Sequence, residues 1–239
     1  MARRRSQKKL ELIAQAALDE FTRVGYKNAQ MVDIARLAQA SVGTLYLYVE
    51  SKETLFRLAF NKAGGEELPT LADGPVRAGS LDEAFAEMER RASAAVYSPR
   101  LVEAWKRDCP ETTIEGELRA VIEELFDDIE TSKHRVRLIE RCARDWPELT
   151  ERWYGQARRT FIDLWLLYLE KRIGGGFIRS VPDAAVAARL VTETCAWFAM
   201  HRYGDYDGSQ LPFDGVRSTV LDLLVHSLLS RTEPPPPEI

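Results

Sequence analysis

Hydrophobic residues recur along most of the chain at spacings of three and four, which is the period of an amphipathic α-helix. Between Ser6 and Val24, for example, Ile13, Ala17 and Phe21 fall on one face, and the glycine that follows is a common stop signal. The strict alternation of apolar and polar residues that is typical of strands is nearly absent. The pattern therefore predicts an all-α fold of about ten helices.

The breaks between the expected helices are marked by glycine and proline. The helices are expected, in order, over residues 6–24, 31–38, 42–48, 51–64, 81–97, 100–108, 114–143, 147–173, 183–203 and 213–230. A stretch rich in Gly and Pro, residues 66–80, separates the first four helices from the others. The chain is therefore expected to begin with a three-helix head (residues 1–50) and a connecting helix (51–65). A larger helical body (66–230) and a disordered Pro-rich tail (231–239) are expected to follow.

The composition fits a globular protein that buries a core, with 45% hydrophobic and 29% charged residues. No apolar run reaches the length of about 18 residues that a membrane span needs. The basic N-terminus, residues 1–9, is not followed by the apolar segment of a secretory signal, so we expect a cytoplasmic protein. The cysteines Cys109, Cys142 and Cys195 lie far apart, which indicates reduced structural thiols. No metal site and no cofactor are expected.

The charge is distributed unevenly along the chain. Residues 1–62 carry 11 Lys and Arg against 6 Asp and Glu, a net charge of +5, whereas the remaining residues carry 22 against 31, a net charge of −9. A basic head on an acidic body is expected where one end of a protein approaches a polyanion. On charge alone, a solvated basic tail without a partner explains the pattern equally well.

The head contains two short helices joined by a tight turn, which cannot bury much surface by themselves. Ala35 and Ala38 are small enough for the helices to cross closely, and Leu45 and Val49 can pack on the first long helix. This is the geometry of a helix-turn-helix, in which the second short helix enters the major groove of DNA. Three ordinary core helices of an all-α domain would satisfy the same spacing.

The second short helix carries polar groups on its outer face. Ser41 can cap the first turn, and Gly43 lets the backbone approach another surface. The candidates for DNA contact in and after this helix are Ser41, Val42, Gly43, Thr44, Tyr46, Tyr48 and Lys52. For the two tyrosines, the alternative is a half-buried ring with its hydroxyl in water. Arg3, Arg4 and Arg5 form a basic arm that can reach phosphates or a minor groove, with a solvated tail as the alternative.

These residues, in their fixed order, resemble the DNA-binding domain of the tetracycline-repressor (TetR/AcrR) family. The resemblance is carried by Asp33-Ile34-Ala35, by Gly43-Thr44-Leu45-Tyr46 within the run 38–49, and by Ser51-Lys52-Glu53. It implies a homodimer that binds a double-stranded DNA operator, usually as a repressor, and is released by a small-molecule effector. It also implies that Thr44, Tyr46, Tyr48 and Lys52 touch DNA, with Val42 and Gly43 close to it.

Some positions depart from the family pattern. Ala29 and Gln30 stand where Thr or Ser usually begins the first short helix, and Gln30 is the candidate contact there. Gln39 stands where the turn usually has glycine. Val42 is apolar where a polar or basic residue is common, so we expect it to touch a thymine methyl group or the DNA backbone.

The body carries all five tryptophans, and large aromatic side chains are mostly core. The resemblance places an effector pocket among the helices at about 81–173, and the candidates to line it are Trp105, Phe126, His134, Phe161, Trp165 and Tyr168. Because pockets are mostly apolar, we expect a hydrophobic or aromatic effector. A lone histidine is more often structural than a ligand contact, which is the alternative for His134.

The last two helices present apolar stripes that suit a four-helix bundle across a two-fold axis. The candidates for this dimer interface are Leu190, Thr194, Phe198, Val220, Leu224 and Leu228. The alternative is that these stripes only close the core of the monomer.

Other functions stay open at this level. The same fold could serve a transcriptional activator, and a helical scaffold could dimerise without binding DNA. An enzyme is not expected, because the sequence shows no nucleophile–base pair on a tight turn, no Gly-rich phosphate loop and no His/Glu metal pair. The carboxylates Asp145, Glu148 and Glu151 are better explained as a solvated helix start.

Overall fold

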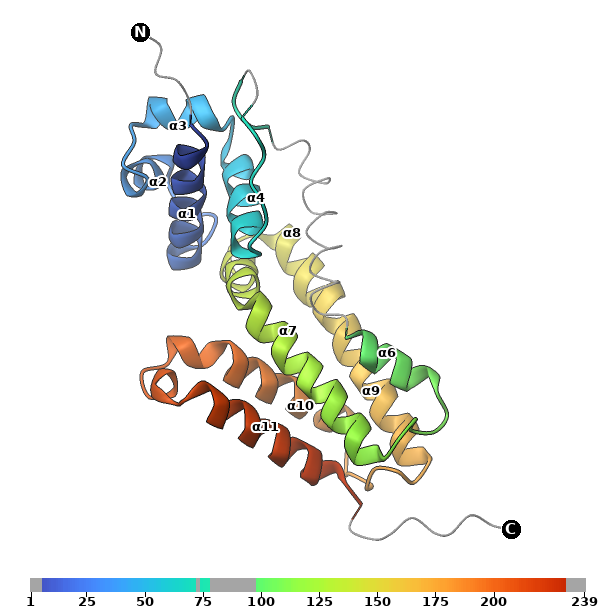
Figure 1. The fold of residues 1–239 in the computed structure, drawn as a ribbon. Helices are drawn as coiled ribbons and strands as arrows, with labels where there is room; N and C mark the ends of the chain where they lie inside the picture. The colour runs from blue at the N-terminus through green and yellow to red at the C-terminus, as the bar shows by residue number, and fades with distance from the viewer. Residues whose placement is uncertain (1–5, 72–73, 78–97, 231–239) are drawn as a thin grey trace, which may run out of the picture. The chain divides into compact units, whose positions relative to one another are not determined.

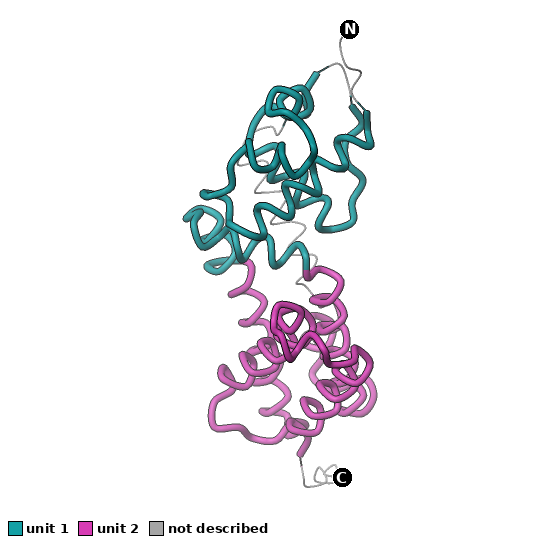
Figure 2. The backbone as a smooth tube through the Cα atoms, turned by 90° about the vertical axis from the view of Figure 1, so that its left-hand side faces the viewer, with its two compact units in different colours: residues 1–92, 134–156 teal, residues 93–133, 157–239 magenta. Residues whose placement is uncertain are grey.

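The computed structural model describes residues 6–71, 74–77 and 98–230. Within these residues the fold is all-α, as predicted, and no β-strand is formed. The chain divides into two compact units (Figure 2): residues 1–92 with 134–156, and residues 93–133 with 157–239. We call them unit 1 and unit 2. The helix expected over 81–97 and the tail over 231–239 lie outside the described residues.

Unit 1 begins with four helices, which are labelled in Figure 1: α1 (Gln7–Val24), α2 (Met31–Leu37), α3 (Val42–Tyr48) and α4 (Lys52–Ala63). Helix α1 packs against α2 and α4, and α2 packs against α3. The buried face of α1 is the one that the sequence period predicts, with Ile13, Ala17 and Phe21 fully buried. Serines begin three of these helices: Ser6, Ser41 and Ser51 each accept a hydrogen bond from an amide of the first turn.

Unit 2 contains α6 (Pro99–Lys106), the first part of α7 (Ile114–Ala143), α9 (Arg158–Gly174), α10 (Ala184–Ala199) and α11 (Phe213–Leu228). Helix α9 packs against α6 and α10, and α10 packs against α11. Two short 3-10 segments, His201–Gly204 and Gly208–Gln210, connect α10 to α11. The apolar faces of these helices meet in one core.

The last turns of α7 belong to unit 1, together with α8 (Pro147–Thr150) and a π-helical segment (Glu151–Ala157). The compact units therefore do not follow the boundaries expected along the sequence, because residues 134–156 pack with the head. The helix expected over 147–173 is also not uniform, since its first turns widen into the π-helical segment. None of the helices that the structure describes is both long enough and apolar enough to cross a membrane.

Candidate DNA interface and effector cavity

Helix α3 packs on the head through its buried residues Leu45 and Tyr48, and Val49, directly after the helix, is buried as well. Ser41 Oγ accepts a hydrogen bond from the Thr44 amide at 3.1 Å and lies 2.8 Å from Thr44 Oγ1. This cap satisfies one of the amides that the first turn leaves without a partner. On the outer side, Tyr46 is 47% exposed, so its ring and hydroxyl are open to a partner molecule.

The first turn of α3 has open space on its outer side. A Cβ atom added at Gly43 would meet only Ser41 Oγ, at 3.9 Å, so the packing of the protein does not require glycine there. Gly43 is exposed, and Val42 and Thr44 are half-buried. The missing side chain therefore leaves room for another surface to approach the backbone, as expected where a helix enters a groove.

A groove of about 600 Å³ runs between α2 and α3. Its lining includes Val32 and Arg36 from α2, next to Ser41 and Thr44. The Arg36 guanidinium is largely exposed and pairs with Asp33 at 3.2 Å. Because a surface ion pair of this kind is weak, Arg36 is available to a phosphate. Val32 and Arg36 were not among the residues predicted from the sequence, since their exposure is evident only once α2 is placed against its neighbours.

The turn between α2 and α3 is fixed by a lysine of α1. Gln39 has a φ of 51°, in the left-handed region that glycine adopts without strain. Lys9 Nζ donates hydrogen bonds to the carbonyls of Ala38, at 2.8 Å, and Gln39, at 2.9 Å. A cation is favourable at this C-terminal end of α2, so Lys9 offsets the strain of having glutamine in place of glycine.

At the other end of α2, Gln30 occupies the N-cap position without making a side-chain cap. Its Nε2 donates a hydrogen bond of 3.4 Å to the Asn28 carbonyl, and the side chain is exposed. Ala29 beside it is buried. Gln30 is therefore accessible to a partner, whereas Ala29 is not. The arm Arg3–Arg5 lies outside the described residues.

Tyr48 does not share the outer face of α3. Only 4% of its surface is exposed, and its hydroxyl accepts a hydrogen bond of 2.9 Å from the Ser6 amide. Leu45 and Tyr48 are three residues apart and so lie on the same, buried side of the helix, while Tyr46 faces outward. The expectation that Tyr48 touches DNA is corrected accordingly.

Lys52, the first residue of α4, is partly buried. Its Nζ lies 4.7 Å from the centre of the Tyr26 ring and donates to the Lys27 carbonyl at 3.4 Å. Burial lowers the pKa of Lys52 below its ordinary value, although Asp145 and Glu53 oppose the shift. Because this ammonium group has already lost part of its hydration in the folded protein, further desolvation on contact with a phosphate costs less free energy.

An aromatic cluster joins the head to the segment 134–156 within unit 1. Trp146 stacks on Tyr26 with 3.8 Å between ring centroids, and Phe56 meets these rings edge-on at 5.2 and 5.7 Å. The Tyr26 hydroxyl donates to Glu53 at 3.0 Å, and burial together with that carboxylate raises the pKa of Tyr26 above its ordinary value. Trp146, which was expected in the body, is therefore part of unit 1 together with the helix-turn-helix.

Asp145 closes the turn that follows α1. Its Oδ1 accepts a hydrogen bond of 3.2 Å from the Lys27 amide. Gly25 in this turn has a φ of 87°, and an added Cβ would collide with the Asp145 carboxylate and the Arg141 guanidinium. Asp145 thus has a structural role in the turn, where the sequence analysis expected a solvated carboxylate.

The aromatic residues expected to line an effector pocket lie in the core of unit 2. Phe126, Trp165 and Tyr168 are fully buried, and Phe161 is nearly so. Trp165 and Tyr168 meet edge to face, with 5.8 Å between ring centroids. The buried Nε1 of Trp165 has no hydrogen-bond partner among the described residues.

Two other pocket candidates lie elsewhere. Trp105 is partly exposed at the end of α6. His134 is exposed and belongs to unit 1, not to the unit that contains the buried aromatic residues. The structure therefore does not support His134 as a polar anchor among those rings.

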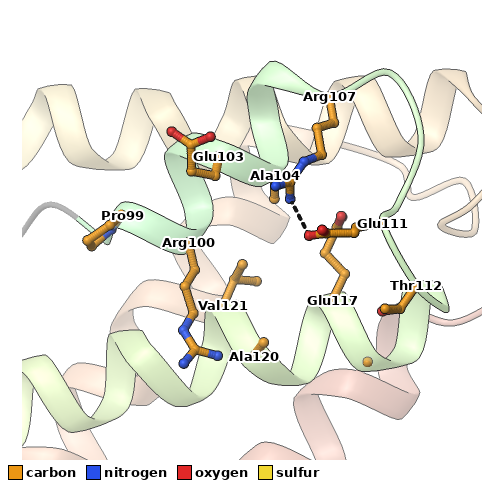
Figure 3. A pocket seen from close by; sticks show the side chains of 11 residues that line it. Pro99, Arg100, Glu103, Ala104, Arg107, Glu111, Thr112, Glu117, Ala120 and Val121 are labelled. Carbon is orange, nitrogen blue, oxygen red and sulfur yellow. Dashed lines mark ion pairs between the residues drawn. The ribbon is translucent and has the colours of Figure 1, made fainter.

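A cavity of about 350 Å³ lies between α6 and the start of α7, entirely within unit 2 (Figure 3). Apolar and charged side chains share its lining, which includes Ala104, Ala120, Val121, Arg100, Glu103, Arg107, Glu111 and Glu117. The guanidinium of Arg107 pairs with the Glu111 carboxylate at 2.9 Å, as the dashed line in Figure 3 shows. The cavity can thus hold a small molecule that has both an apolar and a polar part.

Glu117 connects this cavity to a buried ion pair. Arg172 donates to Glu117 at 2.6 Å from Nε and at 3.1 Å from Nη2, and the Tyr168 hydroxyl donates to the same carboxylate at 3.0 Å. Arg172 also donates to the carbonyls of Ala104 and Arg107, at 2.6 and 3.0 Å. One arginine therefore ties α6, α7 and α9 together beside the cavity.

The residues expected at the dimer interface divide into two groups. Val220, Leu224 and Leu228 are buried in the core of the monomer and are corrected to core residues. Leu190 is 55% exposed, and Thr194 and Phe198 are half-buried. Residues that the sequence analysis did not select share this exposure on α10 and α11: Val186, Trp197 and Leu223.

Comparison with known proteins agrees with the geometry of the head. The sequence profile of the bacterial regulatory proteins of the tetR family matches residues 13–59, which contain the helix-turn-helix. No curated protein matches the sequence.

Among solved structures, the chain is similar to a bacterial regulatory protein in the tetR family from Rhodococcus RHA1, with a TM-score of 0.55 and 14% identity over 94% of this chain and 99% of that one. It is also similar to the ketosteroid transcriptional regulator KstR2 of Mycobacterium tuberculosis, with a TM-score of 0.53 and 16% identity over 96% and 98% of the two chains. At this identity, the likeness concerns the fold. The profile match therefore concerns the helix-turn-helix segment, and the likeness to these two structures shows that the chain has a similar fold.

Proposed function

We propose that the protein is an effector-controlled repressor that binds a palindromic DNA operator as a homodimer. The observation that carries the proposal is the outer face of α3, where Tyr46 and the open first turn at Gly43 stand clear of the packing of the protein. Such a face suits contacts with base edges and phosphates in a major groove. The net charge of +5 over residues 1–62 supports the approach of this end to DNA.

The test is selection of duplexes from random-sequence DNA, followed by fluorescence anisotropy with a recovered duplex. Tyr46→Ala and Lys52→Ala are each expected to weaken binding by about 1–3 kcal/mol, the value of one good contact. Tyr206→Ala is the matched control, because Tyr206 is a largely exposed tyrosine of unit 2. The proposal fails if no duplex is enriched, or if both head variants bind as tightly as the wild type.

The dimer is proposed to form through the exposed apolar side chains of α10 and α11. One reading helix covers only a few base pairs, so two heads have to engage half-sites about 34–36 Å apart. Leu190 and Leu223, which are 55% and 64% exposed, supply unpartnered apolar surface on the two helices. A two-fold interface uses the same surface patch of both protomers, so Leu190 and Leu223 would be buried in each of them.

Analytical ultracentrifugation tests this interface. Leu190→Glu combined with Leu223→Glu should give a monomer, whereas Leu167→Glu, at an exposed leucine of α9, should leave the dimer intact. A dimer that survives the double substitution would place the interface elsewhere.

The effector is proposed to be a small molecule with an apolar body and a polar group, bound at the cavity between α6 and α7. The Arg172 network supports this choice, because an occupant that moves α6 must also disturb the hydrogen bonds at Ala104 and Arg107. Control of DNA binding needs the effector to prefer the DNA-incompetent state by about 1–3 kcal/mol.

Thermal-shift screening of a compound library identifies candidates for the effector. Ala120→Phe, which fills the cavity, should abolish the stabilisation that a true effector gives the wild type. A compound that stabilises both proteins equally binds elsewhere, and one that leaves affinity for the selected duplex unchanged is not an effector.

A further inference from the structure

Helix α2 ends in a turn that usually contains glycine. The Ala40 amide donates a hydrogen bond to the Ala35 carbonyl at 2.8 Å, and the Gln39 amide donates to the Arg36 carbonyl at 3.0 Å. These two bonds define a Schellman motif, in which the residue after the C-cap adopts a left-handed conformation that favours glycine. Gln39 occupies this position with a φ of 51°, and it is the one non-glycine residue with a positive φ in the described part of the chain.

The packing of the head does not explain the glutamine side chain at this turn. Gln39 is exposed, and its side-chain amide makes no hydrogen bond with another described residue. A left-handed conformation is less stable for a residue with a Cβ atom than for glycine. Such strain persists where the surrounding structure maintains it, and it is concentrated at functional sites. Here Lys9 maintains the turn through its hydrogen bonds to the carbonyls of Ala38 and Gln39.

The unpartnered amide lies in the groove between α2 and α3. Gln39 lines this groove together with Arg36, which is three residues earlier in the chain and has 71% of its side-chain surface exposed. In a helix-turn-helix the first of the two helices crosses the DNA backbone while the second enters the major groove. A carboxamide offers two N–H donors, and donors beside a cation are the groups that bind phosphate oxygens. The position and the chemistry of Gln39 therefore favour a phosphate as its partner.

We propose that Gln39 is a DNA-contacting residue, whose side-chain amide donates a hydrogen bond to a backbone phosphate beside Arg36. Glycine would relax the turn but would leave the groove without this donor, so the strained backbone is retained for the contact. Lys9 is a positioning residue, because it holds the turn that presents the amide. The contact adds affinity without reading the base sequence. The inference rests on the proposed binding of operator DNA by this head.

Gln39→Gly removes the amide and also relieves the backbone, so it should change affinity and stability in opposite directions. Affinity for a fluorescein-labelled duplex selected by the wild-type protein should fall about tenfold, the factor for loss of one hydrogen bond to a charged group. The midpoint of thermal unfolding should rise by about 1–4 °C, since relief of the strain outweighs the greater freedom of glycine in the unfolded chain. A glutamine retained only for the fold would not combine weaker binding with higher stability.

Gln39→Met separates the contact from the flexibility of the turn. It keeps the length of the side chain and the strained backbone but lacks the amide, so it should lose about as much affinity as Gln39→Gly without a rise in the unfolding midpoint. Gln210→Met is the matched control, because Gln210 is an exposed glutamine of unit 2, and it should bind the duplex as tightly as the wild type.

Two further readouts identify the phosphate. Both Gln39 variants should weaken binding to the selected duplex and to a duplex of unrelated sequence by the same factor, because a phosphate contact carries no sequence information. The slope of log affinity against log salt concentration should stay unchanged in Gln39→Met, since a neutral side chain releases no counterion. The slope should become shallower by about 0.9 in Arg36→Gln, which removes one cation from the phosphate backbone.

Wild-type affinity in Gln39→Met would overturn the inference, because any loss in Gln39→Gly would then come from the flexible turn. A lower unfolding midpoint in Gln39→Gly would overturn it as well, since the turn would then depend on glutamine for its stability. A loss of affinity confined to the selected duplex would indicate a base contact, and an unchanged salt slope in Arg36→Gln would remove the neighbouring cation from the site. Failure of the wild type to select any duplex would instead count against operator binding itself.

Discussion

Replacing Glu117 by Gln removes the charge of a buried carboxylate while keeping its volume. Arg172 has no exposed side-chain surface and Glu117 is only 8% exposed. Glu117 Oε1 accepts from Arg172 Nε and from the Tyr168 hydroxyl, and Oε2 accepts from Arg172 Nη2. A glutamine amide has a single acceptor oxygen. One of these donors must therefore face the NH₂ group of the glutamine, and the guanidinium loses the carboxylate with which it pairs.

The expected loss of stability is large. Removing one partner of a buried ion pair costs about 3–5 kcal/mol, because the remaining charge stays buried. In a protein of this size each kcal/mol shifts the unfolding midpoint by about 2–4 °C, so Glu117→Gln should lower Tm by about 6–20 °C. Burial is the largest cause of the raised pKa of Tyr168 and persists in the variant, so the phenol stays protonated at neutral pH and supplies no negative charge in place of the carboxylate.

Thermal unfolding followed by circular dichroism, with urea unfolding as a second measure, checks this prediction. Asp127→Asn is the control. Asp127 accepts hydrogen bonds from Arg217 at 2.8 and 2.7 Å, but their side chains are 47% and 27% exposed. Such a surface pair contributes about 0–1 kcal/mol, so the control should lower Tm by no more than about 4 °C. Similar losses for the two variants would refute the view that burial makes the Arg172 pair the stronger determinant of stability.

Other substitutions test the packing of unit 1 and the electrostatics of α7. Trp146→Ala removes the ring that stacks on the head and should lower the free energy of unfolding by about 3–5 kcal/mol in urea titration; a loss below about 1 kcal/mol would contradict the packing. Gly25→Ala should cost more than Gly65→Ala, because both have positive φ but only an added Cβ at Gly25 collides with other side chains. Burial and then neighbouring carboxylates raise the pKa of Asp128 to about 6, so its contribution to stability is present at low pH and is lost as the pH rises through that value. Asp128→Asn should therefore stabilise the protein at pH 7.5 and have little effect below about pH 4, whereas a pH-independent effect would contradict the assignment.

The helices were predictable because their period, caps and breaks are local properties of the sequence. The helix expected over 114–143 has those bounds in the structure, Ile114–Ala143. Period alone was less informative about which stripe of a helix faces inward. In α11 the structure buries Val220 and Leu224 in the core of the monomer and exposes the neighbouring Leu223.

The candidate DNA interface was predictable wherever a residue acts through its own helix, as with the Ser41 cap and the exposed Tyr46. It was not predictable where a contact joins distant segments. Lys9 reaches Gln39 across 30 residues, and Tyr48 binds an amide 42 residues away, so neither role leaves a signature in the surrounding sequence. The composition of α3 suggested that both tyrosines are alike, and only tertiary packing distinguishes them.

The Trp146 stack also bears on how this protein can be divided and recombined. A fragment that ends after α4 would lack the ring that covers Tyr26, together with the carboxylate that closes the turn at Gly25. Transplanting the proposed DNA-binding unit onto another protein therefore requires two pieces of sequence, residues 1–92 and 134–156, to be grafted together. A chimaera joined at a single crossover after α4 would be left with an uncovered aromatic surface, a feature that favours aggregation. For this protein, the transferable module is discontinuous in the gene, although it is compact in space.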